Sequence, residues 1–243
     1  MKRCVVAGIA LPALIWTILV FRTFWIEAPI VGAAAHIVSG DRYKPETLEG
    51  LLSLFRKLPS DRRRSLDKFA ILQLRQAENA ISSGDQSSTN LFIDAATVAS
   101  TEALTRSPTD SFQWLALFSL SNLKYGANPE YVRFLRMSYE YGAQEGWIAA
   151  RRLPVALELF SSLPQNLREA ALIEFVNLVN SEMYSEAADV ADRAGRLLRF
   201  VLFARLKDVS VQKRQSFAAT VFQRNLDDVP IPGIERRPSR PWR

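Results

Sequence analysis

The sequence predicts an all-α protein, with a transmembrane helix near the N-terminus and antiparallel helical hairpins after it. Three observations lead to this fold class. Residues 4–21 form an uncharged apolar run that is long enough to cross a bilayer. Apolar residues recur at helical spacing over residues 45–226, in segments of helix length with short connections. No run of residues alternates between apolar and polar for the length of a strand.

The apolar run near the N-terminus reads CVVAGIALPALIWTILVF and occupies residues 4–21. At about 1.5 Å per residue, it is roughly 27 Å long, close to the bilayer core of about 30 Å. Phe24 and Trp25 follow it, where interfacial aromatic residues are common. The sequence therefore predicts an anchor at residues 1–26, with residues 4–26 in contact with lipid.

The charges that flank this run predict its orientation. Lys2 and Arg3 precede the run, so the positive-inside rule favours a cytoplasmic N-terminus. In a bacterium, the chain would be a single-pass protein of the inner membrane with its helical domain in the periplasm. A cleaved signal peptide is one alternative, because residues 33–35 are three alanines, and a buried helix of a soluble protein is the other. The run is longer than the core of about 7–15 residues that signal peptides have, so we expect an uncleaved anchor.

Three further segments are expected after the anchor. Residues 27–44 contain proline, glycine and small residues and are predicted to be a linker. Residues 45–226 are predicted to form the helical domain. Residues 227–243 are rich in proline and arginine, a composition that cannot build a core, so they are predicted to be a basic, flexible tail.

Capping residues and apolar spacing place the helices of the predicted domain. Asp110 and Asn128 are expected to cap helices that end at Gly126 and Gly142. Pro154 is expected to interrupt the helix that contains it. The remaining helices are expected at residues 45–57, at residues 66–81, before Pro108, around residues 167–178, at residues 186–206 and at residues 217–226. In the helix at residues 186–206, the residues expected to face inward are Val190, Ala194, Leu197 and Val201.

The sequence contains none of the usual constellations of catalytic or ligand-binding residues. His36 is the only histidine and Cys4 the only cysteine, which argues against a metal site built on these residue types. No nucleophile elbow, phosphate-binding loop or dinucleotide fingerprint occurs. We therefore expect no enzyme, and no catalytic, cofactor-binding or metal-ligating residue. The alternative is a glycan-acting enzyme that uses carboxylates only, which requires two acids across a cleft.

Basic residues are concentrated in the C-terminal quarter of the chain. Residues 1–185 contain 19 Lys or Arg and 18 Asp or Glu, whereas residues 186–243 contain 12 and 7. An anionic lipid or polymer would suit this charge. The anchor and the absence of an aromatic platform argue against nucleic acid. The candidate interaction surface consists of Arg193, Arg196, Arg199, Arg236, Arg237 and Arg240.

Two resemblances extend these expectations. Trp114 and Trp147 are 33 residues apart, and Ala96, Ala103 and Pro108 match small and proline positions of the tetratricopeptide repeat. Residues 66–180 thus resemble a degenerate tetratricopeptide array, although the glycine and tyrosine expected after Trp114 are missing. This resemblance implies a right-handed array of helical hairpins.

The stretches TEALTRSPTDSFQWLALFSL and MSYEYGAQEGWIAARRLPVAL carry the second resemblance. They are similar to small membrane-anchored helical proteins that are found with bacterial surface-polysaccharide machinery and that assist the assembly of exopolysaccharide or O-antigen. This resemblance implies a non-enzymatic scaffold that binds a protein partner and assists the synthesis or export of envelope polysaccharide. An exported, soluble helical binding domain remains the alternative if the N-terminal segment is cleaved.

Overall fold

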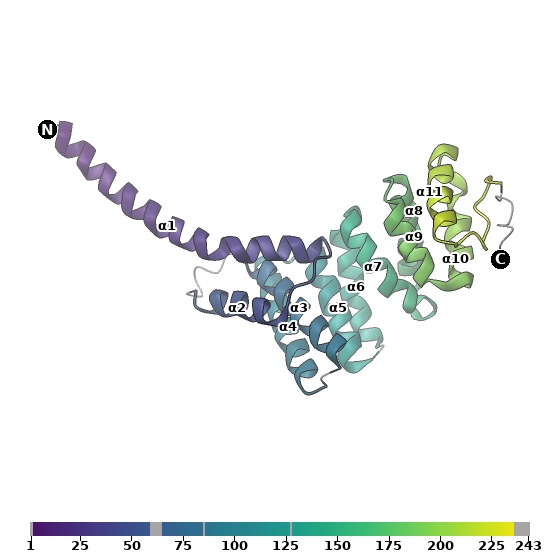
Figure 1. Cartoon of the computed structure of the whole chain (residues 1–243), viewed down its shortest axis with the longest axis horizontal. Helices are drawn as coiled ribbons and strands as arrows, with labels where there is room; N and C mark the ends of the chain where they lie inside the picture. The colour runs from purple at the N-terminus through teal and green to yellow at the C-terminus, as the bar shows by residue number, and fades with distance from the viewer. Residues whose placement is uncertain (1, 59–64, 85, 127, 236–243) are drawn as a thin grey trace. The chain divides into compact units, whose positions relative to one another are not determined.

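The computed structural model describes residues 2–58, 65–84, 86–126 and 128–235 (Figure 1). Among the first 26 residues, it describes side chains only at residues 14–17, 21, 24 and 25. All regular secondary structure in these ranges is helical, so the all-α class is confirmed. The chain divides into two compact units, Met1–Thr109 (unit 1) and Asp110–Arg243 (unit 2).

The predicted anchor falls mostly among residues whose side chains are not described. Its backbone belongs to a continuous helix that starts at Lys2. In the described part of the chain, no helix is long and apolar enough to cross a membrane. The membrane-spanning role of residues 4–26 therefore stays a prediction.

The described residues of unit 1 form four α-helices, which pack mainly around α3. Helix α3 lies along α4, and both α1 and α2 contact α3. Figure 1 shows α1 as one long helix that extends beyond the other three. The four helices are α1 (Lys2–Val38), α2 (Pro45–Arg56), α3 (Leu66–Ser83) and α4 (Gln86–Arg106).

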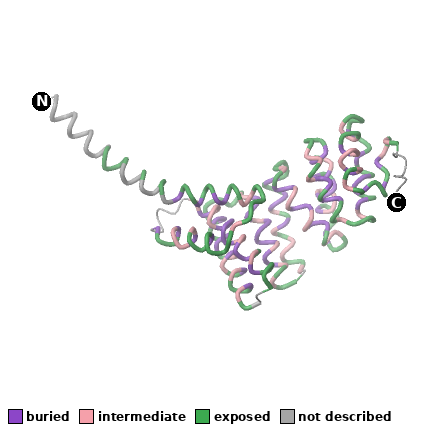
Figure 2. The backbone as a smooth tube through the Cα atoms, viewed as in Figure 1, coloured by how far each residue is buried: buried purple, intermediate pink, exposed green. Residues whose placement is uncertain are grey.

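The predicted linker at residues 27–44 is wrong over most of its length, because α1 continues to Val38. Packing explains the difference. Ile30, Ala33 and Ala34 are buried in unit 1, and the helical backbone brings them to one face. Figure 2 shows buried positions along the part of α1 that lies against the rest of unit 1. The buried carboxylate of Glu27 also accepts a hydrogen bond of 3.0 Å from the Ser65 hydroxyl. These contacts outweigh the helix-breaking tendency of the proline and glycine in this segment.

In unit 2, the part of the chain that the structure describes forms seven α-helices, and the predicted caps are confirmed. The Asp110 side chain accepts hydrogen bonds from the backbone amides of Phe112 and Gln113, both at 3.1 Å. The Asn128 side chain accepts one of 2.9 Å from the amide of Glu130. The helices are α5 (Ser111–Tyr125), α6 (Val132–Tyr141), α7 (Gly146–Glu158), α8 (Gln165–Asn180), α9 (Tyr184–Arg193), α10 (Gly195–Ala204) and α11 (Val211–Gln223), with 3-10 turns at Pro129–Tyr131, Phe160–Ser162 and Arg205–Asp208.

Pro154 does not interrupt its helix, contrary to the prediction, and α7 runs through it. Leu153 and Ala156, on either side of the proline, are both fully buried. Helix α7 packs on α8 and α9. The buried contacts offset the hydrogen bond that proline cannot make.

The long helix predicted at residues 186–206 is two helices, because the chain breaks between α9 and α10. Gly195 has a φ of 69° there, in the left-handed region that favours glycine. The break changes the direction in which the later residues point. Val190 is buried as predicted, but Leu197 and Val201 are exposed, so their predicted inward orientation is wrong.

The predicted flexible tail is also wrong for its first part, residues 227–235. Val229 and Ile231 are buried in unit 2. The guanidinium of Arg214 on α11 donates a hydrogen bond to the carbonyl of Pro232. This segment is therefore part of the folded unit, whereas residues 236–243 lie outside the described residues.

Candidate functional site

The predicted basic surface is divided by the fold. Arg193 and Arg196 are exposed, and the side chain of Arg196 is 78% accessible to solvent. Arg199 is buried: its Nε donates to the carbonyl of Ala191 at 3.0 Å, and its Nη1 donates to the carboxylate of Asp228 at 2.6 Å. The prediction that Arg199 belongs to an exposed basic stripe is therefore wrong. The other three members of the predicted surface, Arg236, Arg237 and Arg240, lie outside the described residues.

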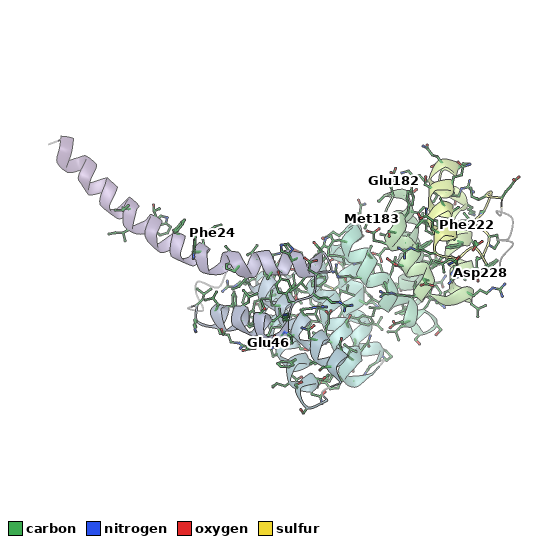
Figure 3. All side chains as sticks on the ribbon, in the orientation of Figure 1. Phe24, Glu46, Glu182, Met183, Phe222 and Asp228 are labelled. Carbon is green, nitrogen blue, oxygen red and sulfur yellow. The ribbon has the colours of Figure 1, made fainter. Side chains whose placement is uncertain are left out.

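The break at Gly195 explains why Arg199 is turned inward. It places Arg199 on the face of α10 that also carries the buried residues Leu202 and Phe203. Asp228 (Figure 3) comes from the segment after α11 and supplies the opposite charge. A buried charge without such a partner is costly, so this ion pair fixes the segment against α10.

The outward face of α10 is apolar, which the sequence did not predict. Leu197 is 87% exposed, Phe200 is 59% exposed and Val201 is 37% exposed. These residues are three and four positions apart, so they lie on one helix face, which we call the α10 stripe. Single exposed apolar residues are common on protein surfaces, but a contiguous group is a candidate contact surface.

A second notable group is a buried polar cluster around Arg152 on α7. Arg152 is fully buried, and its Nε donates to the Glu174 carboxylate on α8 at 3.0 Å. Its Nη1 donates to the Ser138 hydroxyl on α6 at 2.9 Å, and its Nη2 donates to the Gly142 carbonyl at 2.9 Å. The Ser138 hydroxyl in turn donates to the carbonyl of Ser111 on α5 at 2.8 Å. One guanidinium thus joins four consecutive helices.

Burial dominates the electrostatics of this cluster. It raises the pKa of Glu174 above the usual carboxyl range, and the contact with Arg152 partly offsets that rise. Burial also raises the pKa of Tyr139, whose ring lies 4.2 Å from the central carbon of the guanidinium, and the charge of Glu174 adds to the rise. The cluster is closed to solvent, and its hydrogen bonds link α5, α6, α7 and α8.

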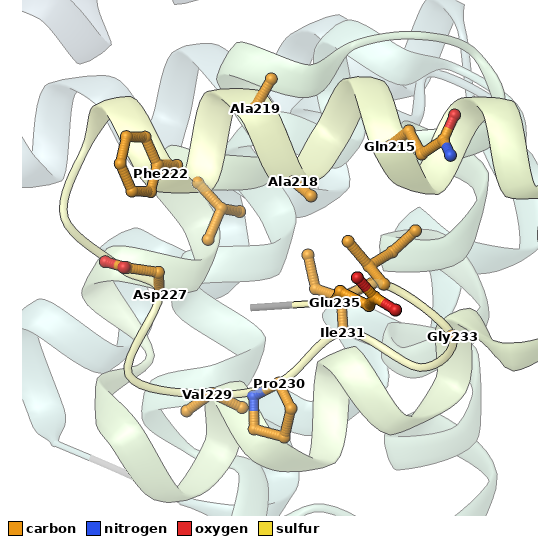
Figure 4. A pocket seen from close by; sticks show the side chains of 12 residues that line it. Gln215, Ala218, Ala219, Phe222, Asp227, Val229, Pro230, Ile231, Gly233 and Glu235 are labelled. Carbon is orange, nitrogen blue, oxygen red and sulfur yellow. The ribbon is translucent and has the colours of Figure 1, made fainter. Parts of the chain in front are cut away.

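A cavity of about 580 Å³ lies between α11 and residues 227–235 (Figure 4). This volume is within the range of about 300–1,000 Å³ that is typical of ligand pockets. Phe222, Val229 and Ile231 contribute apolar walls, and the acids Asp227 and Glu235 also line the cavity. In Figure 4, the carboxylate of Asp227 points away from Glu235, so this pocket does not present the facing pair of acids that a glycan-cleaving enzyme needs.

The described residues contain no group of three or more His, Cys, Asp or Glu that is able to hold a metal ion. No protein-family model matches the chain, and neither do the curated proteins or the solved structures with which it was compared. The α10 stripe and the exposed Arg193 and Arg196 are the surface features with the clearest bearing on binding.

Proposed function

We propose that this chain is a membrane-anchored, non-enzymatic interaction protein of the bacterial envelope. Residues 4–26 would cross the inner membrane once, with the N-terminus in the cytoplasm and the helical units in the periplasm. The units would hold a protein partner at the membrane. The observation that carries this proposal is that the uncharged run at residues 4–21 continues without interruption into a helix that is packed in the core of unit 1.

This continuity supports a retained anchor rather than a cleaved signal peptide. Cleavage after Ala35 would remove Ile30, Ala33 and Ala34, which are buried in unit 1. It would also remove Glu27, which accepts the hydrogen bond from Ser65. A signal peptide is normally dispensable for the folded state of the mature protein, whereas this segment contributes part of the core.

The order of the helices supports an array of helical hairpins. Helix α3 packs on α4, α5 on α6, and α7 on α8, so several pairs of consecutive helices lie side by side, whereas α1 packs mainly on α3 and α11 mainly on α9. Such arrays expose long helix surfaces that bind other proteins. We include in the proposal a right-handed, tetratricopeptide-like arrangement, which rests on the resemblance of residues 66–180. We also include a role in exopolysaccharide or O-antigen assembly, which rests on the resemblance of residues 101–160. The exposed Arg193 and Arg196, with the arginines of residues 236–243, would add contacts to anionic lipid or polymer.

Deletion of residues 2–26 tests the anchoring. The full chain is expected to float with membranes after an alkaline wash, whereas the deleted chain is expected in the soluble fraction. In a bacterial host that lacks the native copy, full-length protein should restore the amount of surface polysaccharide and the deleted chain should not. Equal restoration by a deleted chain that is absent from the membrane would contradict the tethering role.

A further inference from the structure

The α10 stripe is held outward by the packing behind it. The opposite face of α10 carries Leu202 and Phe203, which are fully buried. The Phe203 ring lies 5.5 Å from the Phe217 ring of α11, in an edge-to-face arrangement. Because this face is fixed, the stripe is presented in one orientation and loses little conformational entropy when it binds.

The size and shape of the stripe favour a lipid surface over a protein partner. It consists of three side chains on one ten-residue helix, whereas a stable protein interface takes about 20–30 residues from each side. Leu197 is almost completely exposed, and such a residue is able to enter the boundary between headgroups and acyl chains.

The charges near the stripe favour anionic lipid. Arg193 and Arg196 are exposed at its N-terminal end, and Lys207 is exposed beyond its C-terminal end. Residues 192–208 contain four exposed basic residues and two exposed acidic residues, and Arg196 also lies 3.6 Å from the Asp228 carboxylate. Basic residues beside an exposed Leu and Phe are the pattern of helices that lie in the plane of a membrane surface.

We propose that α10 docks on the surface of an anionic bilayer. Leu197, Phe200 and Val201 would insert at the acyl-chain boundary, and Arg193 and Arg196 would contact lipid phosphates. The inference rests on the proposed function, because an anchor in the same membrane raises the local concentration of lipid and makes a small surface sufficient. Unit 2 would then be attached to the bilayer at a second point besides residues 4–26.

The test uses the full chain with two substitutions, Cys4→Ser and Leu197→Cys, so that position 197 has the only cysteine. An environment-sensitive fluorophore is attached to this cysteine. Leu123→Cys is the matched control, because Leu123 is also an exposed leucine of unit 2, on α5. Both chains are reconstituted in vesicles of phosphatidylcholine alone or mixed with phosphatidylglycerol, with brominated lipids as quenchers. We expect quenching at position 197 in the anionic vesicles and none at position 123. Arg193→Gln and Arg196→Gln are each expected to weaken docking roughly fivefold.

The outcomes separate this inference from the proposed function. If the chain floats with vesicles after an alkaline wash but both labels are quenched equally, α10 does not dock and the anchor stands. If the chain does not float, the proposed anchor is wrong. A different outcome in detergent is that the label at position 197 becomes shielded from solvent to an extent that rises with protein concentration. That result would show that a second copy of the chain covers the stripe, and it would overturn the lipid proposal.

Discussion

Replacement of Arg152 by methionine is expected to destabilise unit 2 by about 3–5 kcal/mol. Arg152 is fully buried and donates to Glu174, Ser138 and Gly142, so its loss leaves the Glu174 carboxylate buried without its cationic partner. Urea unfolding of the detergent-solubilised full chain, followed by tryptophan fluorescence, measures the change in the free energy of unfolding. Protease protection of α6 and α8 should fall in parallel.

A matched control separates burial from charge. Arg205 forms an ion pair with Glu169 at 2.8 Å, and both side chains are close to half exposed. Arg205→Met is therefore expected to cost about 0–1 kcal/mol. Glu174→Leu combined with Arg152→Met should recover much of the loss, since no unpaired charge remains. If Arg152→Met cost no more than Arg205→Met, the cluster would not hold the helices of unit 2 together.

Removal of residues 2–35 is expected to unfold much of unit 1, whereas removal of residues 2–26 is expected to leave it folded. The longer deletion removes Ile30, Ala33 and Ala34 from the core, and burial of a large apolar side chain such as Ile30 contributes about 1.5–3 kcal/mol. It also uncovers the face of α3 on which α1 packs. Hydrogen exchange of the α3 amides in the two purified chains measures the difference.

The shorter deletion is the control, because it keeps every described core contact of α1. Its α3 amides should exchange as slowly as those of the full chain. Equal protection of the α3 amides in both truncated chains would show that residues 27–35 are dispensable for the fold. A cleaved signal peptide would then be the better interpretation of the N-terminal segment. Fast exchange in both would mean that residues 2–26 themselves stabilise unit 1.

Local signals predicted much of the fold. The caps at Asp110 and Asn128 and the helix end at Gly126 depend on residues close together in the sequence, and the structure confirms them. Long-range packing decided the places where the prediction failed. Pro29 and Pro154 each lie inside a helix because residues on other helices bury their neighbours. Local composition contains no information about those distant contacts.

The candidate site was predicted less well than the fold. The inward and outward faces of residues 186–206 were assigned as if one helix ran through them. The left-handed backbone at Gly195 ends α9, so residues after it point in directions that a single helix would not give them. As a result, Arg199 was expected outside and Leu197 inside, and both are reversed. The Arg152 cluster was missed because Glu174 is 22 residues away on another helix. Two adjacent arginines in an apolar helix, Arg151 and Arg152, were the only local signal.

The most direct test of the central claim is the intact mass of the native protein extracted from alkaline-washed membranes. A retained anchor that continues into unit 1 predicts a membrane-bound chain that still includes residues 1–26. A shorter protein that begins at His36 and is recovered in the soluble fraction would contradict the account.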